Sequence, residues 1–416
     1  MAHLFVPSKK ILALTLSSLM LAACGGGGGS DSTSSNTTGS STSSSTSNTG
    51  TGSTGTTSGS TNTSGSSSTI SSEVTSYNGV NKNFSDVGGS ADSTTGLNSV
   101  EQVAFNVLNV ARSQCGFGVL TTNTELQKSA DNHANYLAYH AMTDTAANYT
   151  NSSYVHATHG HNELDTTSPF YSANTIAARL KTDSSKGVLA DAVLYNWRFV
   201  TENLTLMTIP STTIDATYDS RAATHGMRNL LAAPYHMAGL LENKYKELGL
   251  SYRRSTMTSS TGAKLPHSVL EVMSASQTTA TVPTVNGTVH YPCNGITDTA
   301  YELTNEAPNP IPNRNLATNP IGQPVFIQST VGSTLAITAY SMKDAQGNIV
   351  TLSLLNKNND PNGLVATHQA ILMPLTKLNP STTYTVSYTA TVNGVSVGTK
   401  TFSFKTTANQ TLLNKV

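Results

Sequence analysis

Apolar residues recur at helical spacing directly after residue 98. The repeat of Val103, Val107, Val110 and Ala111 predicts a helix that begins near Ser99. Glycine favours the backbone conformation that ends a helix, so the run Cys115-Gly116-Phe117-Gly118 predicts the C-terminus of this one.

A second amphipathic segment begins at residue 124 and reads TELQKSADNHANYLAYHAM. Thr124 is a candidate N-cap, because its hydroxyl can accept a hydrogen bond from a free backbone amide. The period of the pattern predicts one buried face, made of Leu126, Ala130, His133, Ala134, Leu137 and Ala138. Since His133 lies among apolar positions, we interpret it as a hydrogen-bonded core histidine rather than a ligand.

Short segments of alternating polarity dominate the chain after residue 320. They predict strands at Val325-Phe326-Ile327, Thr334–Tyr340, Thr383–Val392 and Thr401–Lys405. Asn393-Gly394 is a strong signal for a tight hairpin turn. We expect a small antiparallel β-sandwich over residues 320–408, preceded by a connector rich in Pro and Asn over residues 279–319.

The N-terminus has the order of an export signal. Lys9 and Lys10 precede an apolar run over residues 11–23, which is too short to span a bilayer as a helix. Leu21-Ala22-Ala23-Cys24 resembles the bacterial lipobox, in which the cysteine is acylated and becomes the mature N-terminus. The resemblance implies a signal peptide over residues 1–23, lipidation of Cys24 by fatty acid such as palmitate, and attachment to a lipid bilayer. The alternative is an ordinary signal peptide.

The residues after Cys24 favour one destination. By resemblance to lipoprotein sorting, Gly25 and Gly26 imply the outer membrane of a Gram-negative cell, on its periplasmic or surface side. Residues 25–69 contain only Gly, Ser, Thr and Asn with a single Asp, a composition that cannot form a packed core. We therefore expect a flexible tether over residues 24–97.

Charge and motifs exclude several classes of function. Lys and Arg number 23 and Asp and Glu also 23, so there is no net charge to attract nucleic acid. The chain has no G-x-S-x-G elbow, no H-E-x-x-H pair and no Walker A lysine.

Several motifs in the middle of the chain occur in an order that resembles the CAP superfamily of SCP-like extracellular domains. They are Leu108-Asn109-x-x-Arg112, the Leu126–Ala134 helix, a histidine before Pro169-Phe170, Glu202-Asn203, and His225 before Asn229-Leu230-Leu231 and Pro234. The histidine is His161, and the neighbouring His156 and His159 belong either to a metal-binding tract or to a solvated loop. The resemblance covers residues 98–278 and implies a three-layer α-β-α sandwich with a mostly antiparallel sheet. The expected fold class is thus α+β, and the segment over residues 320–408 is similar to bacterial Ig-like domains.

The family has a cleft lined by two histidines and two acidic residues. Carried over, these are His161, Glu202 and His225, with Glu163 or Asp219 as candidates for the second acid. Such a set suits Zn²⁺, although all four could equally be hydrogen-bonded structural residues. The resemblance implies a non-enzymatic protein that binds a small apolar ligand, a metal ion or an envelope or host protein. The alternative is a metal-dependent hydrolase resembling a peptidase or an esterase.

The chain has 3 cysteines. If Cys24 carries lipid, Cys115 and Cys293 remain, and an exported protein reaches an oxidising compartment. We expect these two to form a disulfide, the alternative being two separate buried thiols.

Overall fold

The computed structural model describes residues 91–143, 160–185, 197–209, 211, 213–259 and 261–410, and the strand residues 20–23, 68–69, 75–77 and 80–82. Cys24, His156 and His159 lie outside the described residues. None of the described helices is long and apolar enough to cross a membrane.

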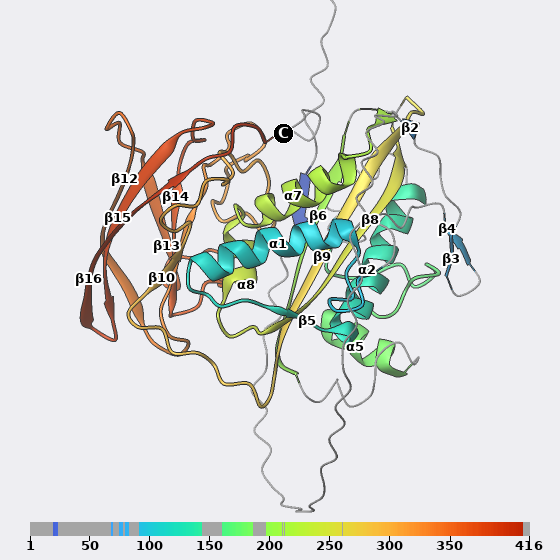
Figure 1. The fold of residues 1–416 in the computed structure, drawn as a ribbon, viewed down its shortest axis with the longest axis horizontal. Helices are drawn as coiled ribbons and strands as arrows, with labels where there is room; N and C mark the ends of the chain where they lie inside the picture. Colours follow the sequence, from blue (N-terminus) through green and yellow to red (C-terminus); the bar gives the residue numbers. More distant parts are fainter. Residues whose placement is uncertain are drawn as a thin grey trace, which may run out of the picture.

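A five-stranded sheet lies at the centre of the first half of the structure (Figure 1). Its strands follow the order β1 (Met20–Ala23), β6 (Trp197–Thr208), β9 (Lys264–Gln277), β8 (Glu247–Thr258) and β5 (Thr121–Thr122). All neighbours are antiparallel except β5, which runs parallel to β8.

Helices lie on both faces of this sheet, because alternate residues of β6 meet different helices. Leu204 and Leu206 pack against α2 (Thr124–Thr143), with α5 (Ile176–Ser185) beside it. Met207 belongs instead to a cluster with α1 (Ser99–Gln114) and α7 (Tyr218–Leu230). A short helix, α8 (Pro234–Leu241), follows α7. The mixed α and β class expected from the sequence is confirmed.

The ends of α1 are where the pattern predicts them. Asn98 accepts hydrogen bonds from the amides of Val100 and Glu101, and the Glu101 carboxylate accepts one from the amide of Asn98. This capping box satisfies amides that have no partner inside the helix. Cys115 ends the helix, and Gly116 follows with φ +81°.

The predicted cap of α2 is wrong by one residue. The side chain of Asn123, not Thr124, accepts hydrogen bonds from the amides of Glu125 at 2.9 Å and Leu126 at 3.2 Å. The predicted inner face is confirmed, since all of its residues are buried: Leu126, Ala130, His133, Ala134, Leu137 and Ala138.

Two antiparallel sheets form the second half of the structure. One has the order β10 (Val289–Tyr291), β11 (Val325–Gln328), β14 (Gln369–Pro374) and β13 (Leu352–Asn356). The other has the order β12 (Leu335–Asp344), β15 (Thr383–Val392) and β16 (Val395–Lys405). The predicted hairpin turn joins β15 to β16, with φ 51° at Asn393 and 80° at Gly394. Because β10 pairs with β11, the segment read as a connector contributes a strand.

Two short antiparallel pairs complete the described strands. They are β2 (Ser68–Thr69) with β7 (Thr213–Ile214), and β3 (Thr75–Tyr77) with β4 (Val80–Lys82).

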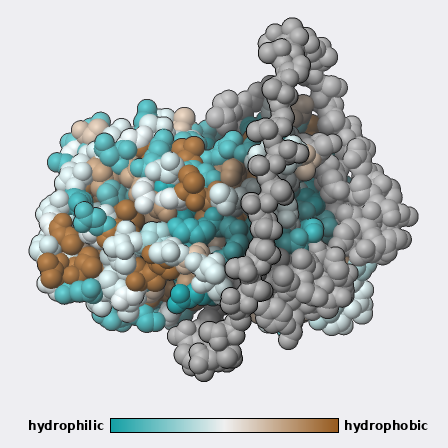
Figure 2. Space-filling view, turned by 60° about the horizontal axis from the view of Figure 1, so that its bottom comes forward, coloured by the Kyte–Doolittle hydropathy of each residue, from teal (hydrophilic) through white to brown (hydrophobic). Residues whose placement is uncertain are grey.

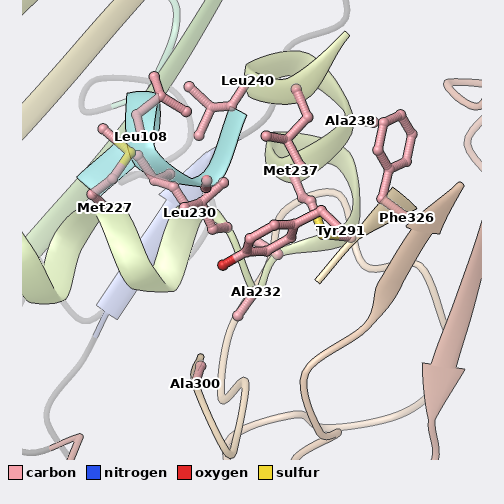
Figure 3. Packing of buried hydrophobic residues seen from close by; sticks show 14 of the residues in the cluster. Leu108, Met227, Leu230, Ala232, Met237, Ala238, Leu240, Tyr291, Ala300 and Phe326 are labelled. Atoms are coloured by element: carbon pink, nitrogen blue, oxygen red, sulfur yellow. The ribbon is translucent and has the colours of Figure 1, made fainter. Parts of the chain in front are cut away.

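The two halves share one hydrophobic cluster. Figure 3 shows Leu108 and Met227 of the first half in the same packed group as Tyr291 and Phe326 of the second. The expected disulfide is present between Cys115 and Cys293, with Cα atoms 5.3 Å apart. The halves are therefore joined by both a covalent bond and a common core.

The surface of the second half carries isolated apolar side chains. Ile349 is 74% exposed and Val395 is 69% exposed. Figure 2 shows apolar surface on that half as patches separated by polar residues.

Candidate metal centre

Two glutamates share one face of the central sheet. Glu202 of β6 pairs with Met273, and Leu204 pairs with Glu271 of β9, so the two glutamates are diagonal neighbours across the strands. Helix α2 covers this face and contributes His133. One ligand atom from each of His133, Glu202 and Glu271 lies within 4.8 Å of the others, and this buried group could hold a metal ion.

Glu202 is held as a carboxylate. Its Oε1 lies 2.8 Å from Nδ1 of His161, and its Oε2 accepts a hydrogen bond from the guanidinium of Arg179. Burial acts to raise the pKa of Glu202, but the charge of Arg179 and then of His133 outweighs it and holds the pKa well below its usual range. Glu202 and Arg179 thus form a buried ion pair within the cluster.

Glu271 has the opposite protonation state. Its side chain is fully buried, and among the described residues no N–H or O–H group donates to either carboxyl oxygen. Burial, and then the charge of Glu202 and a hydrogen bond to it, raise the pKa of Glu271 well above its usual range. The raised pKa favours the neutral acid form of Glu271 at neutral pH.

His161 offers one ring nitrogen. Its Nδ1 contacts Glu202, while its Nε2 is buried and has no hydrogen-bond partner among the described residues. Burial lowers the pKa of His161 and the bond to Glu202 only partly opposes this, so the ring is neutral. A carboxylate that holds Nδ1–H leaves the Nε2 lone pair available to a metal or a proton donor.

The cluster is less open than the cleft expected from the sequence. The side chain of His161 is 9% exposed, and that of Glu202 is not exposed at all. His133 and Glu271 are also fully buried.

His133 is hydrogen-bonded on both sides, as interpreted from the sequence. Its Nδ1 lies 3.1 Å from Oε1 of Glu163, and its Nε2 lies 3.2 Å from the carbonyl oxygen of Gly160. Both partners are acceptors, whereas a neutral imidazole has only one N–H. Two acceptors therefore face a neutral ring that can donate to only one of them. A second proton on the ring, or a metal ion bound at Nε2, would remove this mismatch.

The two candidates for the second acid are in different places. Glu163 lies in the cluster beside His133 and accepts a hydrogen bond of 2.6 Å from the amide of Ser172. Asp219 belongs to α7 and pairs with Arg254 at 2.6 Å and with the Tyr252 hydroxyl at 3.0 Å. Only Glu163 of the two accompanies His133.

His225 is not brought to His161 and Glu202. It belongs to α7, whose Gly226 packs against Thr205 and Met207 on the opposite face of the sheet from Glu202. Burial, and then the charge of Arg228, lower the pKa of His225 to about 3. His225 is thus a neutral core residue of the other layer.

Three residues of the cluster were missed in the sequence. Glu271 is the one acidic residue of a strand that is otherwise apolar or neutral in its buried part, and that pattern was a usable signal. His236 lies with its ring 6.5 Å from that of His161. Both His225 and His236 precede a Leu-Leu pair, and it is the ring of His236 that lies beside that of His161 in the structure. Arg179 gave no local signal.

Comparison with known protein families finds no match for this chain, and comparison with curated proteins finds none either.

Proposed function

We propose that this chain is an exported bacterial lipoprotein, anchored in the outer membrane by Cys24, that binds a divalent cation in a CAP-like domain. That domain corresponds to residues 98–278, and residues 320–408 form an Ig-like module. The cation is Zn²⁺, held by His133, Glu202 and Glu271. The observation that carries the proposal is the buried carboxyl group of Glu271, which no donor satisfies.

The donor set fits Zn²⁺. One imidazole and two carboxylates match the ligand types that zinc accepts, and three protein ligands leave a position for water or a ligand. A bound cation would favour the ionised form of Glu271 and would relieve the surplus of acceptors around His133. Arg179 and His161 would then orient Glu202 from its outer side.

Isothermal titration of the full-length chain with ZnCl₂ tests the proposal. We expect one zinc per chain, with affinity reduced at least about tenfold in Glu271→Gln. Affinity should also fall as pH is lowered, because protons compete for the ligand atoms. The matched control is Glu101→Gln, which alters another buried carboxyl group whose pKa burial raises to about 7, but one that lies beside Arg253.

An absence of zinc binding in the wild-type chain would refute the metal proposal. Equal affinity in wild type and Glu271→Gln would refute the ligand set. If no zinc binds, the CAP-like domain remains a candidate for binding an apolar ligand or an envelope partner.

The second candidate is a hydrolase, favoured by the opposite protonation of Glu202 and Glu271. Two carboxyl groups whose surroundings separate their pKa values can act as base and acid in one reaction. Turnover of a peptide or ester library, lost in both Glu202→Gln and Glu271→Gln, would support it. A co-purifying lipid without turnover would support binding.

A further inference from the structure

A glutamate from outside the helix–sheet–helix part contacts a histidine whose ring lies beside that of His161. Glu306 lies in the segment that leads to β11, and its side chain is fully buried. Its Oε1 accepts a hydrogen bond of 2.7 Å from the amide of Tyr235 and lies 3.3 Å from Nδ1 of His236. Glu306 therefore meets the first turn of α8 at two adjacent residues.

His236 connects this glutamate to the cluster. Its ring stacks on that of His161, with centroids 6.5 Å apart and planes 26° apart. His161 in turn contacts Glu202 through Nδ1. Two carboxylate–histidine pairs thus meet through their imidazole rings, and of their four residues only Glu306 comes from the second half of the structure.

The second half also fixes the neighbouring Tyr235. Its hydroxyl donates to Oδ1 of Asp360 at 2.5 Å and accepts from Asn362 at 2.8 Å. The other oxygen of Asp360 accepts hydrogen bonds from the amides of Leu364 and Val365. These bonds hold the start of α8 in a defined position relative to the second half.

The buried position of Glu306 is energetically costly for a carboxyl group that has no role beyond packing. Its Oε2 has no hydrogen-bond partner among the described residues, and burial raises its pKa while His236 opposes the shift. A leucine would fit such a site without the cost of desolvating a carboxyl group. Its favourable polar contacts are those to Tyr235 and His236.

We propose that Glu306 is a positioning residue of the metal centre, which fixes the orientation and tautomer of His236 and, through the stacked rings, of His161. The second half of the structure is then a working part of the site rather than a spacer. The effect on zinc rests on the proposed function, whereas the effect on the two histidines does not require a metal.

The test uses the full-length, metal-free chain labelled with ¹⁵N-histidine. An acceptor at Nδ1 fixes the proton there, so we expect the ring of His236 to be the Nδ1–H tautomer. Glu306→Leu should remove this preference and shift the ring signals of His161. Glu306→Gln keeps an acceptor oxygen and should preserve both.

Glu242→Leu is the matched control. Glu242 is a buried carboxyl that also joins the halves, through a contact of 3.0 Å with Nε2 of His368. This variant should change the signal of His368 and leave those of His236 and His161 in place. Zinc affinity should fall at least about tenfold in Glu306→Leu and stay within about twofold in Glu242→Leu.

Unchanged signals of His236 and His161 in Glu306→Leu would overturn the proposal and leave Glu306 a structural residue. A wild-type His236 with its proton on Nε2 would also overturn it, and this measurement needs no variant. If the wild-type chain binds no zinc but the ring signals respond as expected, the proposed function fails and the positioning role stands.

Discussion

Glu202 and Glu271 lie diagonally across β6 and β9 on the face that α2 covers, and their pKa values are shifted in opposite directions. The difference arises from their neighbours. Arg179 donates to Glu202, whereas among the described residues no group donates to Glu271. Two carboxyl groups so close in a buried site cannot both ionise without an additional cation.

Glutamine should replace Glu271 with little loss of stability, because it resembles the neutral acid. The same change at Glu202 leaves the buried guanidinium of Arg179 without its counter-ion, and breaking a buried pair costs about 3–5 kcal/mol. Urea unfolding at pH 7 should show this difference. Equal destabilisation by both variants would contradict the protonation states described above.

The pH dependence of the two variants should have opposite signs. Because the pKa of Glu271 is raised in the folded chain, this carboxyl group ionises more readily in the unfolded chain. The contribution of Glu271 to the free energy of unfolding therefore falls as pH rises above the ordinary pKa of 4.5. The free energy of unfolding of Glu271→Gln should therefore increase relative to that of the wild type as pH rises. The lowered pKa of Glu202 contributes stability above that value, which is lost as pH falls through its folded pKa.

The two histidines of the sequence-based site should behave differently toward zinc. Because His161 contacts Glu202 directly, His161→Gln should weaken zinc binding about tenfold or more. His225→Gln should leave the affinity within about twofold, since that residue lies on α7 behind the sheet. Titration of both variants with ZnCl₂ decides, and a larger loss in His225→Gln would restore the original assignment.

Removing the Cys115–Cys293 disulfide should destabilise the contact between the halves. The bond closes a loop with a sequence separation of 178, for which the chain-entropy model gives up to about 5 kcal/mol. The double variant Cys115→Ser/Cys293→Ser should unfold at a correspondingly lower urea concentration. Peptide mapping that finds both thiols alkylated without reductant would disprove the bond.

Replacing Cys24 with serine should abolish incorporation of labelled fatty acid and release the chain from the membrane fraction. The reason is the order of Lys9-Lys10, the apolar run over residues 11–23 and the cysteine. The Cys115→Ser variant is the control and should remain in the membrane. Label retained by Cys24→Ser would contradict the lipoprotein assignment.

Local patterns predicted the elements of the fold well. The start of α1, the inner face of α2 and the turn at Asn393-Gly394 follow from capping, period and turn chemistry, which neighbours in sequence determine. The disulfide followed from cysteine count and compartment. These features need no knowledge of distant contacts.

The site was harder to predict because its members come from separate elements. Glu202 and His161 were found through a resemblance, but the register that places Glu271 beside Glu202 depends on strand pairing across 69 positions. The choice between His225 and His236 depends on which of the two rings lies beside that of His161, a contact between residues from separate elements. Sequence order alone does not determine either.

Substitution of Gly249 should disturb the site from a distance. A Cβ at Gly249 of β8 would overlap the backbone of Leu126 and Gln127, where α2 is fixed by hydrogen bonds between Gln127 and Leu250 of 2.6 and 2.8 Å. Since backbone cannot rotate aside, Gly249→Ala should displace α2 and lower the free energy of unfolding by more than about 3 kcal/mol.

Gly226→Ala is the control, because its Cβ would meet only side-chain atoms, and it should change the free energy of unfolding by about 1 kcal/mol or less. Thermal unfolding measures the stability of both variants, and zinc titration of the folded fraction measures their affinity. Affinity should fall only in Gly249→Ala, because displacement of α2 moves His133 away from the site. Equal effects in the two variants would contradict the close approach of α2 to β8.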